Sequence, residues 1–227
     1  MDGSADLRKR WGNLMARLGA VPGGNDPIFS LLVGRYSEPH RRYHTLHHVA
    51  DVLDEIEGLV AAGETVVDID AVELAAWFHD AVYEPGAPDN ESRSAQLATE
   101  ALGGMGMDGE RVERVATLVL ATARHVPDGP DAAVLCDADL AVLGRDRAGY
   151  LRYARQIRSE WSHLDDARYR RGRTAVLRGI LERPLTYHTR AMRHARGARL
   201  IENVRDEIDR LSDDGRPVDV ALHDAVV

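Results

Sequence analysis

The chain has 227 residues, 44% of them hydrophobic, and a formal net charge of −8. This length suits one large domain or two small ones, and the apolar share is enough to build a core. The acidic balance argues against broad binding to nucleic acid or to an anionic membrane. Because Cys136 is the one cysteine of the sequence, an internal disulfide framework is excluded.

The N-terminal segment MDGSADLRKRWGNLMARLG lacks the long apolar region and the cleavage pattern of a signal peptide. No run of the sequence approaches the roughly 18 apolar residues that a membrane span requires. We therefore expect a cytoplasmic protein without a membrane segment. Aromatic residues make up only 5% of the chain, and the abundance of Ala, Leu and Arg favours helices over sheets.

Apolar residues recur at helical spacing along the first half of the chain, with polar or glycine-rich stretches between them. The first predicted helix ends before Gly19, and the second starts at Asp26-Pro27. The third helix is expected at about 43–62. The fourth would start at a cap, Asp68 or Asp70, and run to about Tyr83. The fifth would cover 91–102, after a cap at Asp89 or Asn90.

The second half continues the helical pattern, with a predicted loop at VPDGPDAA, residues 126–133. The expected helices cover about 108–125, 134–144, 146–160, 165–182 and 189–212. We therefore predict one all-α domain of about nine or ten helices over residues 1–212. The C-terminal tail, 213–227, is predicted to pack as an arm or to fray.

His79 and Asp80 lie in the stretch AVELAAWFHDAV, which is apolar on nearly every side and should be buried. An ionised aspartate in a core is costly unless it is paired or bound to a cation. Adjacent helical positions point about 100° apart, so both side chains can converge only on something beside the helix. A metal ion would satisfy both, and a hydrogen-bonded His-Asp pair is the alternative.

The stretch RRYHTLHHVADVL, residues 41–53, holds three histidines at the start of the predicted helix 43–62. His44 and His48 are four residues apart and would share one helix face, a spacing that offers two nitrogens to one metal. His47 would point about 100° away from His48, toward the surface. The alternative is a set of polar residues at an exposed helix start.

Asp137 and Asp139 lie in the apolar segment VLCDADLAVLG. Two positions along a helix correspond to about 200°, so the two carboxylates cannot both face one ion equally. One should be a ligand and the other should support the structure. Asp139 is the better ligand candidate, and Asp137 suits a helix N-cap.

The order His, His-Asp, Asp resembles the HD superfamily of metal-dependent phosphohydrolases. The likeness is greatest to a branch of unassigned substrate with the motifs RxYHxxxH, AxxFHDxxYxP with xNExxSA, TxxH and DADLxxLG. The matching segments are RRYHTLHH at 41–48, AAWFHDAVYEP at 75–85, NESRSA at 90–95, TARH at 122–125 and DADLAVLG at 137–144. The match runs from about residue 8 to 212.

By this resemblance the fold is a single HD-type helical domain, and His79, Asp80 and Asp139 are metal ligands. The first histidine ligand stays open between His44 and His48. We favour His48, with His44 facing the substrate, because the apolar residues after His48 fit the helix phase. The implied cofactor is a divalent ion, Mn, Fe, Co, Ni, Mg or Zn, among which a mixed imidazole and carboxylate site does not choose.

The resemblance also implies catalytic roles for three residues. Asp80 would orient the attacking water, and His44 and His125 would bind phosphate or protonate the leaving oxygen. In similar HD enzymes a histidine at the place of His125 binds a second metal or the substrate phosphate. The alternative for His125 is a histidine at a helix C-terminus, favoured by the macrodipole.

Arg41, Glu91 and Asp137 are the candidates for substrate binding. Arg41 would clamp a phosphate, or would pair with an acidic neighbour on the surface. Glu91 belongs to the NE of the motif, and would otherwise be a carboxylate in the first turn of a helix. Asp137 has the helix-capping alternative given above.

The sequence therefore predicts metal-dependent hydrolysis of a small phosphate ester, such as a nucleotide, by a metal-activated water. The expected partner is a small phosphorylated substrate, with neither nucleic acid nor membrane. A di-iron HD-type oxygenase and a non-catalytic metal- or nucleotide-binding HD module are the alternatives. The oligomeric state is open and includes a homodimer.

Overall fold

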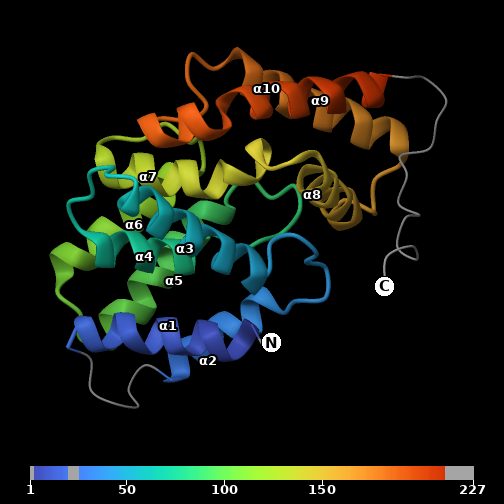
Figure 1. Ribbon diagram of the computed structural model, residues 1–227. Helices are drawn as coiled ribbons and strands as arrows, with labels where there is room; N and C mark the ends of the chain where they lie inside the picture. Colours follow the sequence, from blue (N-terminus) through green and yellow to red (C-terminus); the bar gives the residue numbers. More distant parts are fainter. Residues whose placement is uncertain (1–2, 20–25, 213–227) are drawn as a thin grey trace.

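The computed structural model describes residues 3–19 and 26–212, so the predicted tail 213–227 lies outside this part of the chain. The described residues form ten α-helices, one short 3₁₀ helix and no strand, which confirms the predicted all-α fold (Figure 1). The helices are α1 (Gly3–Arg17), α2 (Asp26–Tyr36), α3 (Leu46–Ala61), α4 (Ile69–Phe78), α5 (Asn90–Gly104), α6 (Gly109–Thr122), α7 (Pro130–Asp139), α8 (Arg147–Glu160), α9 (Asp166–Glu182) and α10 (Arg190–Ser212), with η1 at Leu140–Gly144.

The helices are stacked around the short, buried helix α4 (Figure 1). The α1–α2 pair lies on one side of this centre, and α9 and α10 run side by side on the opposite side. Every residue of α4 from Ala71 to Phe78, except Glu73, is buried. One hydrophobic cluster extends from Leu7 in α1 to Leu211 in α10, so burial of apolar surface links all layers. No helix of the described chain is long and apolar enough to cross a membrane.

Helix α3 begins later than its sequence predicts, because a threonine caps it. The Thr45 backbone is extended, with φ −120° and ψ 177°, and its side chain accepts a hydrogen bond from the His47 N–H. This is the geometry of a helix N-cap. The predicted start at Tyr43 is therefore wrong, and His44 lies in the turn before the helix.

Helix α4 ends at Phe78 and not near Tyr83, since the N–H groups of Ala81 and Val82 no longer make helical i to i−4 bonds. The Val82 N–H donates to the hydroxyl of Ser94, which in turn donates to the Val82 carbonyl. The Asn90 side chain bonds both the N–H and the carbonyl of Glu84. Side chains of α5 thus hold the chain after Asp80 in an irregular turn.

Helix α7 starts inside the stretch that the sequence predicts as a loop. Gly129 adopts φ 97°, a left-handed conformation that favours glycine, and Pro130 follows in the first turn of the helix. Proline is well suited there because its missing N–H would have no helical partner. The prediction that 126–133 is entirely loop is therefore wrong, and Asp137 lies near the end of its helix.

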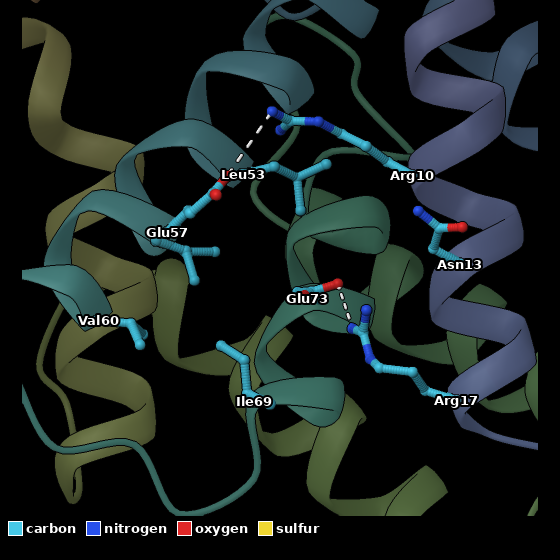
Figure 2. A pocket seen from close by; sticks show the side chains of 9 residues that line it. Arg10, Asn13, Arg17, Leu53, Glu57, Val60, Ile69 and Glu73 are labelled. Carbon is cyan, nitrogen blue, oxygen red and sulfur yellow. Dashed lines mark hydrogen bonds and ion pairs between the residues drawn. The ribbon is translucent and has the colours of Figure 1, made fainter.

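Charged side chains attach α1 to the centre of the molecule. Figure 2 shows Arg10 directed at Glu57 of α3, and Arg17 paired with Glu73 of α4 at 2.7 Å. Trp11, a buried residue of α1, packs edge-on against Trp77 of α4, with ring centroids 5.4 Å apart. A hollow of about 360 Å³ between α1, α3 and α4 lies beside these pairs, and no histidine or cysteine lines it.

The α9–α10 layer contains a buried ionic cluster. The Arg173 guanidinium donates to both carboxylate oxygens of Glu207, at 2.9 and 3.2 Å. Tyr150 of α8 also donates to Glu207. On the next turn of α10, the Asn203 side chain donates to the carbonyls of Leu143 and Arg145, both at 2.9 Å. These contacts join α8, α9 and α10 to the segment that follows α7.

Candidate metal centre

Four side chains from α3, α7 and the turn after α4 converge near the centre of the molecule. His48, His79, Asp80 and Asp139 each offer one nitrogen or oxygen atom, and these atoms lie within 4.8 Å of one another. We call these four residues the ligand group. His48 lies in the first turn of α3, His79 and Asp80 follow directly after α4, and Asp139 is the last residue of α7. This group could hold a metal ion.

The distances inside the ligand group fit one divalent ion. His48 Nε2 lies 3.1 Å from His79 Nε2 and 3.0 Å from Asp139 Oδ1. The remaining pairs that involve these nitrogens span 3.1 to 3.6 Å. Metal–ligand bonds of about 2.1 Å put neighbouring donor atoms about 3.0 Å apart at right angles and about 3.4 Å apart in a tetrahedron. The observed separations, 3.0 to 3.6 Å, lie within this range or slightly above it.

The hydrogen bonds of the two histidines leave their inner nitrogens available. His79 Nδ1 donates to the Ala76 carbonyl at 2.9 Å, so Nε2 can carry a lone pair toward the group. Such an outer hydrogen bond commonly orients a ligating histidine. His48 packs its ring against Tyr43, with centroids 4.6 Å apart, and its buried Nδ1 has no hydrogen-bond partner. Two facing imidazole nitrogens cannot satisfy each other without a proton or a cation between them.

The charges of the group also call for a cation. Burial alone would lower the pKa of His79, but the carboxylates of Asp80 and Asp139 raise that pKa well above its usual value. Burial alone would raise the pKa of Asp80 and of Asp139, but the neighbouring histidines hold both pKa values below their usual range. The paired carboxylates therefore draw positive charge onto the His79 imidazole, the charge that a metal ion would otherwise supply.

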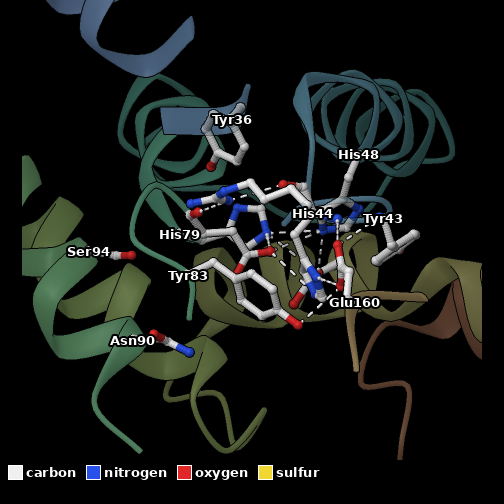
Figure 3. A network of polar contacts seen from close by, with 12 residues as sticks. Tyr36, Tyr43, His44, His48, His79, Tyr83, Asn90, Ser94 and Glu160 are labelled. Carbon is white, nitrogen blue, oxygen red and sulfur yellow. Dashed lines mark hydrogen bonds and ion pairs between the residues drawn. The ribbon is translucent and has the colours of Figure 1, made fainter. Parts of the chain in front are cut away.

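His48, and not His44, contributes the first histidine nitrogen to the ligand group. The expectation that both share one helix face is wrong, because α3 begins at Leu46. His44 instead reaches the group from the preceding turn, and its Nε2 lies 4.0 Å from Asp80 Oδ2. Its ring stacks on Tyr83, with centroids 4.0 Å apart, as Figure 3 shows.

His125 lies on the other side of the group. Its Nε2 is 2.8 Å from Asp139 Oδ2, the oxygen that does not face His48. Helix α6 ends at Thr122, so the predicted helix end at His125 is wrong, and His125 lies in the turn after the helix. Its φ of +48° is uncommon for a residue other than glycine, and such conformations are often found at functional sites.

The structure separates the two aspartates of the DAD segment, in line with the predicted division of roles. Asp139 joins the ligand group, while Asp137 is fully buried and faces the start of α10. Its oxygens accept from the N–H groups of His188 and Thr189, both at 2.7 Å, and from the Thr189 hydroxyl. Asp137 is therefore not the N-cap of its own helix, because α7 begins seven residues earlier, at Pro130.

Arg41 connects the two turns that carry His44 and Asp80. Its side chain is fully buried, and Nη1 donates to the carbonyls of both residues, at 3.0 and 2.7 Å. Nη2 donates to the Ala81 carbonyl at 3.1 Å. These bonds assign Arg41 a role in holding the site together, whereas phosphate binding by Arg41 stays a prediction.

Glu91 lies half-buried in the first turn of α5. Among the described residues it forms no hydrogen bond or ion pair with the ligand group, so its predicted role in substrate binding gains no support from the geometry. Its motif neighbours Asn90 and Ser94 hold the turn after Asp80. The NExxSA segment therefore supports the site by holding the backbone of the turn that follows Asp80.

Sequence reasoning misses one residue at the centre. Glu160, the last residue of α8, has a side chain with no exposed surface and lies 2.7 Å from His44 Nδ1. In the sequence it closes an arginine-rich helix and reads as a surface carboxylate. Its one local signal is that it is the sole acidic residue of the segment RAGYLRYARQIRSE.

The chain was compared with family models, with curated proteins and with solved structures. No family model, curated protein or solved structure matches it. The resemblance to the HD superfamily therefore rests on the sequence motifs alone, and the ligand group rests on its own geometry.

Proposed function

We propose that this protein is an HD-type, metal-dependent phosphohydrolase that cleaves a small phosphate ester, such as a nucleotide. One observation carries the proposal: two histidines and two aspartates converge on one point, with a further histidine on each side. Neutral imidazoles and two carboxylates suit a divalent ion of the Mn, Fe, Co, Ni, Mg and Zn set. When bound, such an ion lowers the pKa of a water and offsets the charge that develops on a phosphoryl group.

Differences in exposure indicate the side from which a substrate would enter. The side chains of His48 and His79 are only 2% and 1% exposed, whereas those of Asp80 and Asp139 are 17% and 15% exposed. His44 and His125 are exposed to a similar extent as the carboxylates, 17% and 16%. The buried histidines form the floor of the site, and the other four residues face its opening.

Each residue at the opening has a chemical role in this proposal. Asp80 accepts a proton from the attacking water and orients it toward phosphorus. The imidazolium form of His44, which carries a hydrogen on both nitrogens, donates its Nε2 proton to the leaving oxygen; this Nε2 lies 4.0 Å from Asp80 Oδ2. His125 contacts a phosphate oxygen from the opposite side, next to Asp139. In this proposal an acid and a base act on the same phosphate ester.

The test is a hydrolysis screen with the full chain. Nucleoside monophosphates, sugar phosphates and p-nitrophenyl phosphate are incubated with added Mn, Fe, Co, Ni, Mg or Zn, and phosphate release is measured. We expect cleavage by the wild type that His79→Ala and Asp80→Ala each abolish. His48→Ala should abolish cleavage as well. His47→Ala is its matched control, because the His47 side chain is 80% exposed on the same helix turn.

Three outcomes would count against this proposal. No cleavage of any ester by the wild type, or cleavage that survives both ligand variants, would contradict hydrolysis at this site. Two irons per chain with a visible charge-transfer band would favour an HD-type oxygenase. Tight nucleotide binding without turnover would favour a non-catalytic metal- or nucleotide-binding module.

A further inference from the structure

Glu160 is a buried carboxylate beside the ligand group without being part of it. It ends α8, and its side chain has no exposed surface. Figure 3 shows it next to His44 and Tyr83, on the side of His44 away from His79. A buried carboxylate is costly unless hydrogen bonds compensate for the lost water. The identity of its partners therefore indicates what the residue does.

The two oxygens of Glu160 have separate partners. Oε1 accepts three consecutive backbone N–H groups, from Arg42 at 2.7 Å, Tyr43 at 2.8 Å and His44 at 3.0 Å. Oε2 accepts from side chains, His44 Nδ1 at 2.7 Å and the Tyr83 hydroxyl at 3.1 Å. One oxygen thus fixes the turn before α3, and the other contacts the imidazole that faces Asp80.

The contact between Glu160 Oε2 and His44 places a hydrogen on Nδ1 of the imidazole. An ionised carboxylate only accepts hydrogen bonds, so Nδ1 must be the protonated nitrogen in the bond to Oε2. Nε2 is then the nitrogen directed toward Asp80, 4.0 Å away. Tyr83 stacks on one face of the ring and Tyr43 meets it edge-on, with centroids 4.0 and 5.0 Å away. The ring therefore cannot turn without breaking several contacts.

We propose that Glu160 is a positioning residue that keeps His44 with Nδ1–H toward α8 and Nε2 toward the substrate. Tyr83 supports it by binding the same oxygen and stacking on the same ring. The inference about catalysis rests on the proposed phosphohydrolase activity, whereas the orientation of His44 does not. Carboxylates that orient a histidine in this way have large effects on turnover in other hydrolases.

Glu160→Gln separates the two functions of the carboxylate. The amide oxygen can still accept the three backbone N–H groups, but the amide nitrogen that replaces Oε2 cannot accept the Nδ1 hydrogen. We expect kcat for phosphate release to fall by about 10²- to 10⁴-fold, with KM changed less than about threefold. The circular dichroism spectrum should remain that of the wild type.

A second readout does not need turnover. Zinc-loaded protein labelled with ¹⁵N in histidine should show a low-field, slowly exchanging Nδ1–H proton, which His44→Ala identifies by its loss. Glu160→Gln should remove this signal. Tyr83→Phe should keep it, because the bond between His44 and Glu160 remains, and should lower kcat by less than about tenfold.

Glu207→Gln is the matched control. Like Glu160, Glu207 is a buried carboxylate that accepts from a tyrosine hydroxyl, but it lies in α10 and its other partner is Arg173. It should leave both kcat and the His44 signal unchanged. Wild-type kcat together with an intact Nδ1–H signal in Glu160→Gln would overturn the proposal. If that variant does not fold, absence of the signal in the wild type overturns it equally. If the wild type cleaves no ester, the proposed function fails while the proton signal still decides the role of Glu160.

Discussion

The molecule has two buried polar clusters, and they are built differently. In the α9–α10 layer, Arg173 and Glu207 form a two-pronged ion pair, and Tyr150 donates to the same carboxylate. Every strong charge there has an opposite partner in the protein. In the ligand group, two imidazole nitrogens lie 3.1 Å apart beside two carboxylates. Among the described residues, no arginine or lysine side chain pairs with Asp80 or Asp139.

This difference separates structure from function. The Arg173–Glu207 pair is complete without any ion or ligand, and its contacts join α9 to α10. The ligand group presents several electron-pair donors to one point, so its charges are balanced only by protons or by a metal ion. A buried cluster of acceptors without a cationic side chain is therefore a stronger indication of a site than burial or charge alone.

The largest stability effect is expected from the complete cluster. Arg173→Met should lower the free energy of unfolding by about 3–5 kcal/mol, because it leaves the Glu207 carboxylate buried without its partner. The double variant Arg173→Met with Glu207→Leu should recover most of the loss. Urea unfolding curves measure both. If Arg173→Met is as stable as the wild type, the ion pair does not hold the helices together, and the proposed difference between the two clusters is contradicted.

The ligand group should respond to metal where the ion-pair cluster does not. Zn²⁺ or Mn²⁺ at about 100 times its dissociation constant should raise the free energy of unfolding by about 2.7 kcal/mol. The gain should disappear in Asp139→Ala and persist in Arg173→Met. Thermal unfolding with and without a chelator measures it. An equal gain in Asp139→Ala would mean that the ion binds elsewhere.

Local sequence signals predict much of the fold because they act over a few residues. Helical periodicity gives the correct class and nearly all of the helices. The errors fall where one side chain overrides the pattern. Thr45 caps α3 after His44, and Ser94 takes the N–H that would have extended α4 past Asp80. Gly129 and Pro130 start a helix in a segment whose composition predicts a loop.

In the candidate site, too, local geometry is predicted correctly and distant contacts are not. The spacing of Asp137 and Asp139 correctly predicts that only one of them joins the group, because helical geometry links neighbouring positions directly. His44 reaches the group although the argument that placed it there, a shared helix face, is wrong. Glu160 is 116 positions from His44, and no local pattern encodes a contact over such a separation. Tertiary packing alone brings these two residues together.

A smaller effect is expected at acid pH, and it tests Glu160. Burial alone would raise the pKa of Glu160, but His44 and the backbone N–H groups lower it from its ordinary value of 4.5 to about 2. The ionised carboxylate thus stabilises the fold above about pH 4.5, and this contribution is lost as the pH falls toward 2. Glu160→Gln should be less stable than the wild type by about 1–2 kcal/mol at pH 7. The difference in stability between the two proteins should become smaller below pH 4.5 in denaturation experiments. A difference that does not change with pH would contradict an ionised Glu160 in the folded protein.

The smallest effect is expected at the surface of α1. Arg17 pairs with Asp70 and Glu73, both at 2.7 Å, but its own side chain is 44% exposed. Water screens such pairs, so Arg17→Ala should lower the free energy of unfolding by at most about 1 kcal/mol, and less in 1 M salt. The metal response should be that of the wild type. A loss as large as that of Arg173→Met would show that exposure does not separate these two ion pairs. The stability that α1 contributes would then have to be separated from the buried packing of Trp11 against Trp77, which joins the same two helices.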